Sequence, residues 1–126
     1  AGERPEDKAG TEEVRDGQGS GDGEDSWLLE SAYQKCLEFD LSQHGILFRQ
    51  QVPLPVEYKG TRIECGYRID LLVDDAVIVE LKSVDQLVPV HEAQLLTYMK
   101  LARIHTGLLI NFNQQRLVDG LRRFKL

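Results

Sequence analysis

The sequence predicts an α/β (α+β) fold in which helices flank a mixed β-sheet. Two apolar, β-branched runs at 66–73 and 77–82 are joined by a short acidic turn, a pattern that is typical of adjacent strands. Segments with the apolar spacing of helices stand before and after them, at 27–43 and 89–102. The apolar run at 106–112 follows the second helix, so it can pair parallel to the strand at 77–82 and make the sheet mixed.

Residues 1–26 are acidic and rich in glycine. They hold nine acidic residues, three basic residues and six of the eleven glycines, so the formal charge of −6 belongs wholly to them. Such a segment cannot bury enough apolar surface to offset its ordering entropy. We expect a disordered acidic tail at 1–26 and one neutral domain at 27–126, which is within the usual domain size.

The first helix is expected from Trp27 to about Gln43. Glu30 falls in its first turn, where the helix dipole favours a carboxylate, so its position has a purely structural explanation. Apolar residues recur along it at the spacing of a helix. They are Leu29, Ala32, Tyr33, Cys36 and Leu37.

The next strands are expected to form an antiparallel meander that ends at Lys82. Residues 46–58 have an extended pattern, and Pro53 and Pro55 confine it to an edge or an irregular run. Lys59-Gly60 turns the chain back. After the second helix and its following strand, residues 114–126 predict a short helical turn and a last strand.

Three charged residues lie inside the central apolar pair: Asp70, Glu80 and Lys82. Burying them costs several kcal/mol per ion unless they pair or hold a metal. Glu80 and Lys82 share one face of their strand. A two-residue loop would place Asp70 on the opposite face, whereas a three-residue loop at 74–76 would pair it with Glu80. A joint site therefore requires an odd loop or a bulge.

These residues suit metal-dependent chemistry. Asp70, Glu80 and the Leu81 carbonyl offer hard oxygen ligands for Mg²⁺ or Mn²⁺. Lys82 could orient a water or stabilise charge that builds on a phosphate. The alternative is a buried salt-bridge network of the same side chains that only fixes the register of the hairpin.

A polar stripe on the second helix has two interpretations. His91, Gln94 and Tyr98 recur at i, i+3 and i+7, which fits an ordinary solvated face as well as a second wall of the site. Cys36 and Cys65 are too few for a Cys-only zinc site or an iron–sulfur cluster. Without an apolar run of membrane length or a signal peptide pattern, we expect a cytoplasmic protein that does not contact a membrane.

Several blocks together resemble a known family. Asp70, then Glu80-Leu81-Lys82, then a helix with Gln94 and Tyr98 resembles the PD-(D/E)XK nuclease superfamily and the Q-x-x-x-Y helix of its RecB-like branch. A closer resemblance is to the GxxExxY protein family. It is carried by five blocks in order, at 28–33, 66–73, 77–82, 91–98 and 107–113.

The resemblance implies a restriction-endonuclease-like core with a central mixed sheet flanked by helices. It implies Mg²⁺- or Mn²⁺-dependent hydrolysis of DNA or RNA. The implied site residues are Glu30, Asp70, Glu80 and Lys82 at the metal, with Gln94 and Tyr98 lining the site, where they would position the substrate. Trp27 stands where the family motif begins with Gly, and the acidic tail replaces an amphipathic helix, which could leave an apolar face open for a homodimer.

A competing hypothesis is a catalytically silent nuclease-fold module for binding or assembly. The neutral body, the missing first helix and the lack of a dense basic groove favour it. Metal binding that depends on Asp70 would separate the two hypotheses.

Overall fold

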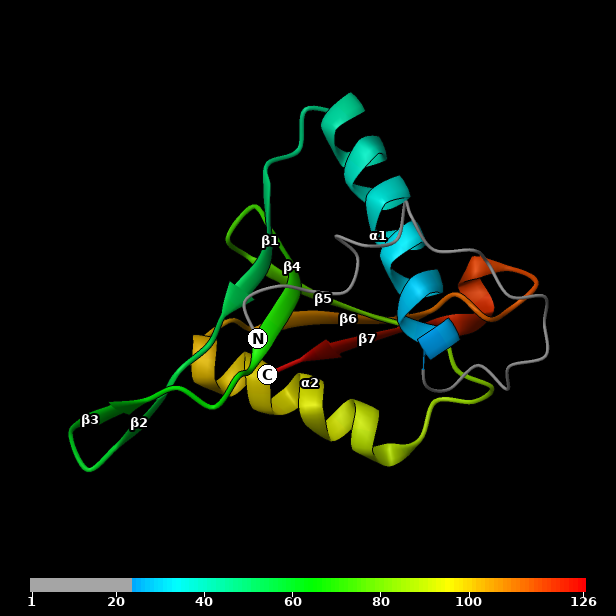
Figure 1. The fold of residues 1–126 in the computed structure, drawn as a ribbon. Coiled ribbons are helices and arrows are strands. Elements are labelled where there is room, and N and C mark those ends of the chain that lie inside the picture. The colour runs from blue at the N-terminus through cyan, green and yellow to red at the C-terminus, as the bar shows by residue number, and fades with distance from the viewer. Residues whose placement is uncertain (1–23) are drawn as a thin grey trace.

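The computed structural model describes residues 24–126. Residues 1–23 of the predicted tail lie outside the described part, whereas residues 24–26 belong to the first helix. The five-stranded sheet has the order β1-β4-β5-β6-β7, and β2 pairs with β3 separately (Figure 1). The elements in chain order are α1 (Glu24–Gln43), β1 (Phe48–Pro53), β2 (Val56–Tyr58), β3 (Thr61–Ile63), β4 (Arg68–Val73), β5 (Val77–Lys82), α2 (Pro89–Ala102), β6 (Thr106–Asn111), the 3₁₀ helix η2 (Leu117–Gly120) and β7 (Leu121–Lys125).

The sheet is mixed, as predicted. β4 runs antiparallel to β1 and β5, β6 runs parallel to β5, and β7 returns antiparallel along β6. The β5–β6 pairing is parallel because α2 carries the chain back across the sheet, and a parallel pair needs such a crossover. The prediction of a mixed sheet flanked by helices, a restriction-endonuclease-like arrangement, is confirmed.

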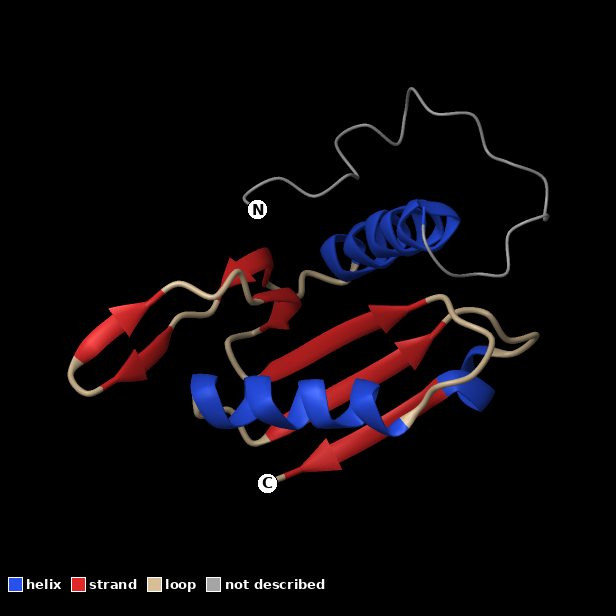
Figure 2. Cartoon of the chain, turned by 60° about the horizontal axis from the view of Figure 1, so that its bottom comes forward, coloured by secondary structure: helices blue, strands red, loops and turns tan. Residues whose placement is uncertain are grey.

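The two helices cover opposite faces of the sheet (Figure 2). On the α2 face, Leu95 and Met99 are completely buried against strand residues that include Ile78 and Leu109. The other face packs Leu71, Val79, Leu81 and Ile110 against Leu37 and Leu41 of α1. Alternation along β5 therefore sends Leu81 toward α1, while Glu80 and Lys82 lie on the face that α2 covers.

The predicted meander is wrong at one place. β2 and β3 do not join the sheet but form a hairpin of their own that projects from the body (Figure 1). Leu54 is buried, and its amide donates to the Tyr67 carbonyl at 3.0 Å, which brings the two ends of the excursion together. Pro53 and Pro55 end the β1 ladder at this point because proline cannot donate to it.

The first helix forms as predicted, but most of its apolar residues at helical spacing do not face the core. From Leu28 to the end of α1, the buried side chains are Ser31 and Gln34, while Leu37 and Leu41 pack on the sheet. Polar groups turn inward here because Gln34 finds partners there: its amide donates to the Asp70 carbonyl at 3.4 Å and its oxygen accepts from Gln51 at 3.2 Å. Four of the five apolar residues at helical spacing are exposed: Leu29, Ala32, Tyr33 and Cys36.

The carboxyl-terminal half follows the predictions. α2 begins at Pro89, and β6 is followed by the short helical turn η2 and the last strand β7. Two close approaches shape this half: a Cβ on Gly107 would lie 2.6 Å from the Met99 sulfur, and a Cβ on Gly120 would lie 2.1 Å from the Asn111 carbonyl oxygen. Within residues 24–126, no helix has both the length and the apolar character needed to cross a membrane.

Candidate active site

Asp70 on β4 and Glu80 on β5 face each other across the two central strands. The pairs Leu71↔Val79 and Val73↔Val77 leave a loop of Asp74, Asp75 and Ala76, the odd length that a joint site requires. Continuing this register by one residue sets Asp70 opposite Glu80 on the α2 face. Each side chain is only 4% exposed.

Backbone amides hold both carboxylates. The Asp70 amide donates to Glu80 Oε2 at 3.1 Å, and the Leu81 amide donates to Asp70 Oδ2 at 2.9 Å. Within one strand residue the N–H and the C=O point to the same neighbouring strand, so the Leu81 carbonyl is directed at β4 as well. The two carboxylates therefore meet between β4 and β5, on the side to which the Leu81 backbone is turned.

Lys82 continues the same face of β5 and reaches α2. Its ammonium lies 3.5 Å from Gln94 Oε1, and the Gln94 amide donates to the Tyr98 hydroxyl at 2.9 Å. Gln94 thereby connects the cation of β5 with the phenol of α2. Lys82 is half-buried and Tyr98 is 4% exposed, so the Gln94–Tyr98 part of the predicted stripe is a wall against the sheet and not a solvated face.

Tyr98 has a perturbed acidity. Burial raises the pKa of its hydroxyl above the ordinary value of 10.0, the hydrogen bond from Gln94 acts in the opposite direction, and the charges of Glu80 and Asp70 raise it further. The hydroxyl therefore stays protonated at neutral pH next to the two carboxylates. A protonated phenol remains able to donate a hydrogen bond to a bound ligand.

Glu30 approaches the site from the other helix. Because α1 begins at Glu24, Glu30 lies in its second turn, and the prediction that placed it in the first turn is wrong. The helix dipole acts within the first turn and does not account for this residue. Glu30 Oε2 accepts a hydrogen bond from the amide of Ser83, the residue after Lys82, at 3.2 Å. Glu30 thus fixes the end of β5.

His91 has a local role in the structure. Its Nδ1 accepts a hydrogen bond from the Val88 amide at 3.0 Å, and its own amide donates to the Val88 carbonyl at 2.9 Å, so His91 fixes the start of α2. Of the three stripe residues, His91 belongs to the helix start, whereas Gln94 and Tyr98 belong to the site.

Two glutamines of the site were not predicted. Gln34 binds the Asp70 carbonyl, and Gln51 binds Gln34. Gln51 lies between the register pairs Gln50↔Leu71 and Val52↔Ile69, hence opposite Asp70, and has φ of 51°. Positive φ in a residue other than glycine is a strained conformation that clusters near functional sites. A signal for Gln34 existed, since it follows Glu30 by one helical turn and so shares its face; nothing in the sequence marked Gln51.

The donor set fits a hard divalent cation. Two buried carboxylates and one carbonyl are the oxygen ligands that Mg²⁺ uses when waters and a substrate phosphate complete its coordination. Across residues 24–126, no cluster of three or more His, Cys, Asp or Glu side chains has the arrangement of a metal site.

Comparisons with known proteins agree with this arrangement. The sequence profile of the PD-(D/E)XK nuclease superfamily matches residues 22–124. Among curated proteins, none matches the chain significantly. The crystal structure of SSO0001 resembles the chain with a TM-score of 0.59 and 20% sequence identity, over 78% of this chain and 50% of that one, so the chain spans half the length of this structure. At that identity the likeness concerns the fold. The profile match covers nearly the whole described chain, and the chain belongs to the PD-(D/E)XK nuclease superfamily.

Proposed function

We propose that the protein is a Mg²⁺-dependent nuclease that hydrolyses phosphodiester bonds of DNA or RNA. The observation that carries the proposal is the pair Asp70 and Glu80, buried and opposed across β4 and β5, with Lys82 next along the same face. Two like charges buried together are costly unless a cation joins them. Membership of the superfamily supports nuclease activity. The identity of the metal and the kind of nucleic acid are proposed in addition.

Asp70, Glu80 and the Leu81 carbonyl would hold Mg²⁺ or Mn²⁺. A bound cation of this kind polarises a phosphoryl oxygen and lowers the pKa of its water. The cross-strand amides from Asp70 and Leu81 orient the two carboxylates before the cation arrives, and such preorganisation avoids a reorganisation cost during the reaction.

The remaining residues have distinct roles in this proposal. Lys82 stabilises negative charge that builds on the phosphate, and Gln94 keeps its ammonium in place. Gln94 and Tyr98 position the substrate from α2. Glu30 acts as an auxiliary acidic residue and holds the Ser83 amide, so it fixes the backbone directly after Lys82.

A cleavage assay tests the proposal. The protein is incubated with single- and double-stranded DNA and RNA, with Mg²⁺ or Mn²⁺ and with EDTA, beside the variants Lys82→Ala and Lys100→Ala. Lys100 is an exposed lysine in the last turn of α2 and serves as the matched control. Loss of one stabilising cation is expected to slow cleavage roughly 100- to 1,000-fold in Lys82→Ala, with Lys100→Ala unchanged. Equal cleavage by the wild type and Lys82→Ala contradicts the proposal.

A catalytically silent binding or assembly module is the second candidate. It is favoured by the small donor set, because among the described residues no third His, Cys, Asp or Glu completes the pair Asp70 and Glu80 in a metal cluster. Calorimetric titration with Mn²⁺ separates the candidates. A nuclease should bind Mn²⁺ in a way that Asp70→Asn abolishes, whereas a silent module without a metal site should show no such difference.

Three finer assignments stay predictions: the GxxExxY family, the RecB-like branch and a cytoplasmic location. A homodimer also stays a prediction. It is supported by the side of α1 that carries Phe39, which is 64% exposed, because exposed apolar surface favours a partner. Light scattering on the wild type and Phe39→Glu tests it: a dimer that becomes a monomer in the variant supports this face.

A further inference from the structure

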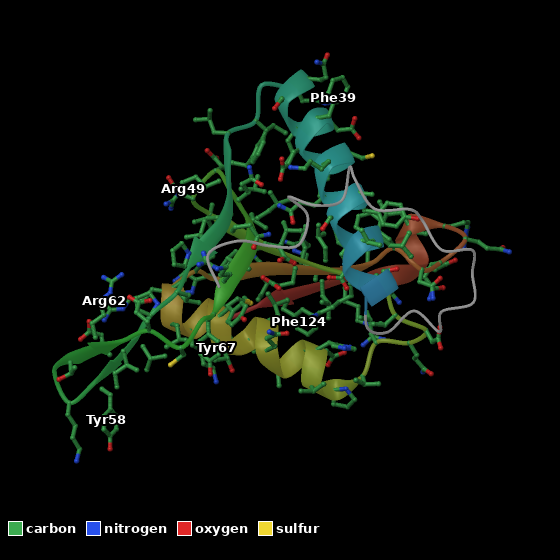
Figure 3. All side chains as sticks on the ribbon, in the orientation of Figure 1. Phe39, Arg49, Tyr58, Arg62, Tyr67 and Phe124 are labelled. Atoms are coloured by element: carbon green, nitrogen blue, oxygen red, sulfur yellow. The ribbon has the colours of Figure 1, made fainter. Side chains whose placement is uncertain are left out.

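A pocket of about 370 Å³ adjoins the catalytic face. Its walls come from α2 and from the segment that leads into β4, and Figure 3 labels Tyr67 in front of α2. The volume falls within the usual range of small-ligand sites. The lining residues are Tyr67, Val90, Ala93, Gln94, Thr97 and Tyr98.

The pocket presents an aromatic surface to solvent. The rings of Tyr67 and Tyr98 lie 5.6 Å apart at an angle of 46°; Tyr98 is 4% exposed, but Tyr67 is 38% exposed. Across the pocket Val90 is 65% exposed. The backbone of Tyr67 is held in place, because its carbonyl accepts a hydrogen bond from the Leu54 amide at 3.0 Å. A fixed, open aromatic ring with an apolar neighbour is suited to stacking on a flat ligand.

The pocket is one residue away from the proposed reaction centre. Gln94 lines it and also lies 3.5 Å from the Lys82 ammonium. A base stacked on Tyr67 and a phosphate bound at Lys82 could therefore belong to the same nucleotide or to neighbouring nucleotides. Gln94 and Thr97 add amide and hydroxyl groups to the rim, the polar complement that reads the edge of a nucleobase.

Charge favours base contacts over phosphate contacts. Residues 27–126 carry equal numbers of acidic and basic residues, and two arginines near the carboxyl terminus are engaged, Arg116 with Asp119 and Arg122 with Glu92. A duplex hides its bases and is held mainly through its phosphates. A single strand exposes bases that can stack on aromatic side chains.

We propose that this pocket binds an unpaired nucleobase next to the scissile phosphate, with Tyr67 as the stacking platform, and that the substrate is single-stranded nucleic acid. The position next to a scissile phosphate rests on the proposed nuclease function, whereas the binding of a base does not. The ring of Tyr67 does the stacking and its hydroxyl is dispensable. Single-stranded DNA and RNA share this chemistry, and separate arms of the test distinguish them.

Binding is measured in EDTA, so that cleavage does not interfere, by the fluorescence anisotropy of labelled single strands and of the matching duplex, each as DNA and as RNA. The variants are Tyr67→Ala, Tyr67→Phe and, as the control, Tyr58→Ala, which removes an exposed tyrosine of the projecting hairpin. Thermal melting confirms that each variant is folded. Loss of the stacked ring is expected to weaken single-strand binding roughly 5- to 150-fold in Tyr67→Ala, while Tyr67→Phe and Tyr58→Ala bind like the wild type.

Two results overturn the inference: single-strand affinity that is unchanged in Tyr67→Ala, or a duplex that binds the wild type as tightly as the single strand does. The outcome of the cleavage assay is independent of the outcome of the binding assay. Binding that depends on Tyr67 without cleavage by any metal removes the nuclease function and leaves the base pocket. Cleavage that depends on Lys82 but is indifferent to Tyr67, in strands whose binding is equally indifferent, removes the pocket and leaves the nuclease.

Discussion

Asp70 and Glu80 link β4 to β5 through their side chains where the regular strand pairing stops. The register runs from Val73↔Val77 to Leu71↔Val79. Beyond that point the Asp70 amide donates to Glu80 Oε2 and the Leu81 amide donates to Asp70 Oδ2. The carboxylates thus take the place of ladder hydrogen bonds, and this ties the proposed metal ligands to the stability of the sheet.

Glu80→Gln and Glu80→Ala should differ in stability. Glutamine keeps an acceptor for the Asp70 amide and removes a negative charge beside Asp70, so we expect its free energy of unfolding to match the wild type or exceed it by about 1 kcal/mol. Alanine leaves a buried donor without its acceptor and should cost about 1–3 kcal/mol. Urea denaturation without metal measures both. A glutamine variant as unstable as the alanine variant would favour the alternative of a structural salt-bridge network.

The length of the β4–β5 loop should control metal binding. Deleting Ala76 leaves a two-residue loop, which moves Asp70 to the face opposite Glu80. We expect the deletion to abolish Mn²⁺ binding in calorimetry and to lower the melting temperature. Inserting two glycines after Asp75 keeps the loop odd and should cost only about 1 kcal/mol, with Mn²⁺ binding retained. A folded deletion variant that still binds Mn²⁺ contradicts the proposed ligand pair.

This loop also shows what the sequence could predict. The alternation of side chains, the chemistry of Asp70 and the spacing to Glu80 reduced the question to a choice between two loop lengths. The sequence did not decide between them, because Asp74 and Asp75 adopt φ of 55° and 53°, a conformation that acidic residues tolerate but do not require.

The first helix was harder to predict, for a physical reason. Leu29, Tyr33 and Phe39 are exposed, whereas the inward face carries Ser31 and Gln34. Hydrogen bonds from Gln34 to the Asp70 carbonyl and with Gln51 replace apolar contacts there. Periodicity detects apolar burial and is blind to polar groups that are buried with partners. Sites of this kind depart from local sequence rules because function places polar groups in the interior.

Glu30 can be assigned by a pair of substitutions. If its role is to accept the Ser83 amide, Glu30→Gln should retain cleavage and Glu30→Ala should lose it. If the negative charge matters at the metal, both variants should lose activity, roughly 10- to 100-fold as seen for outer partners of metal sites. We expect the second pattern, because Glu30 is the auxiliary acidic residue of the proposed nuclease site. Rates at saturating Mn²⁺ with single- and double-stranded substrates distinguish the patterns.

Tyr98 should produce a stability loss at alkaline pH. Its pKa is raised above 10.0 by burial in the folded state, so its protonated form is favoured by folding. This contribution is fully present below the unfolded pKa and is lost as the pH rises through the folded pKa. We expect the wild type to lose more stability above pH 10 than Tyr98→Phe does. Urea midpoints at neutral and alkaline pH measure the difference. Equal losses of stability in both proteins would show that the pKa of the Tyr98 hydroxyl is not raised in the folded state.

Two glycines that look alike in sequence should respond differently to alanine. A Cβ at Gly107 meets the Met99 sulfur at 2.6 Å, but that contact is the far end of a flexible side chain that can shift. A Cβ at Gly120 meets the Asn111 backbone oxygen at 2.1 Å. Asn111 is 1% exposed, and its side chain exchanges hydrogen bonds with both the amide and the carbonyl of Val84.

Gly120→Ala must therefore displace the end of β6 and disturb the connection that follows Lys82. We expect it to cost about 3 kcal/mol or more and Gly107→Ala about 1 kcal/mol, measured by urea denaturation. Gly60→Ala is the control: Gly60 has φ of 77° and an open surrounding, so it reports backbone strain alone, about 1 kcal/mol. Because the β6 end supports the segment next to the catalytic lysine, Gly120→Ala should also lower cleavage at temperatures where it remains folded, whereas Gly60→Ala should not. A Gly120→Ala variant as stable and active as Gly60→Ala would show that β7 and η2 can move away without disturbing the site.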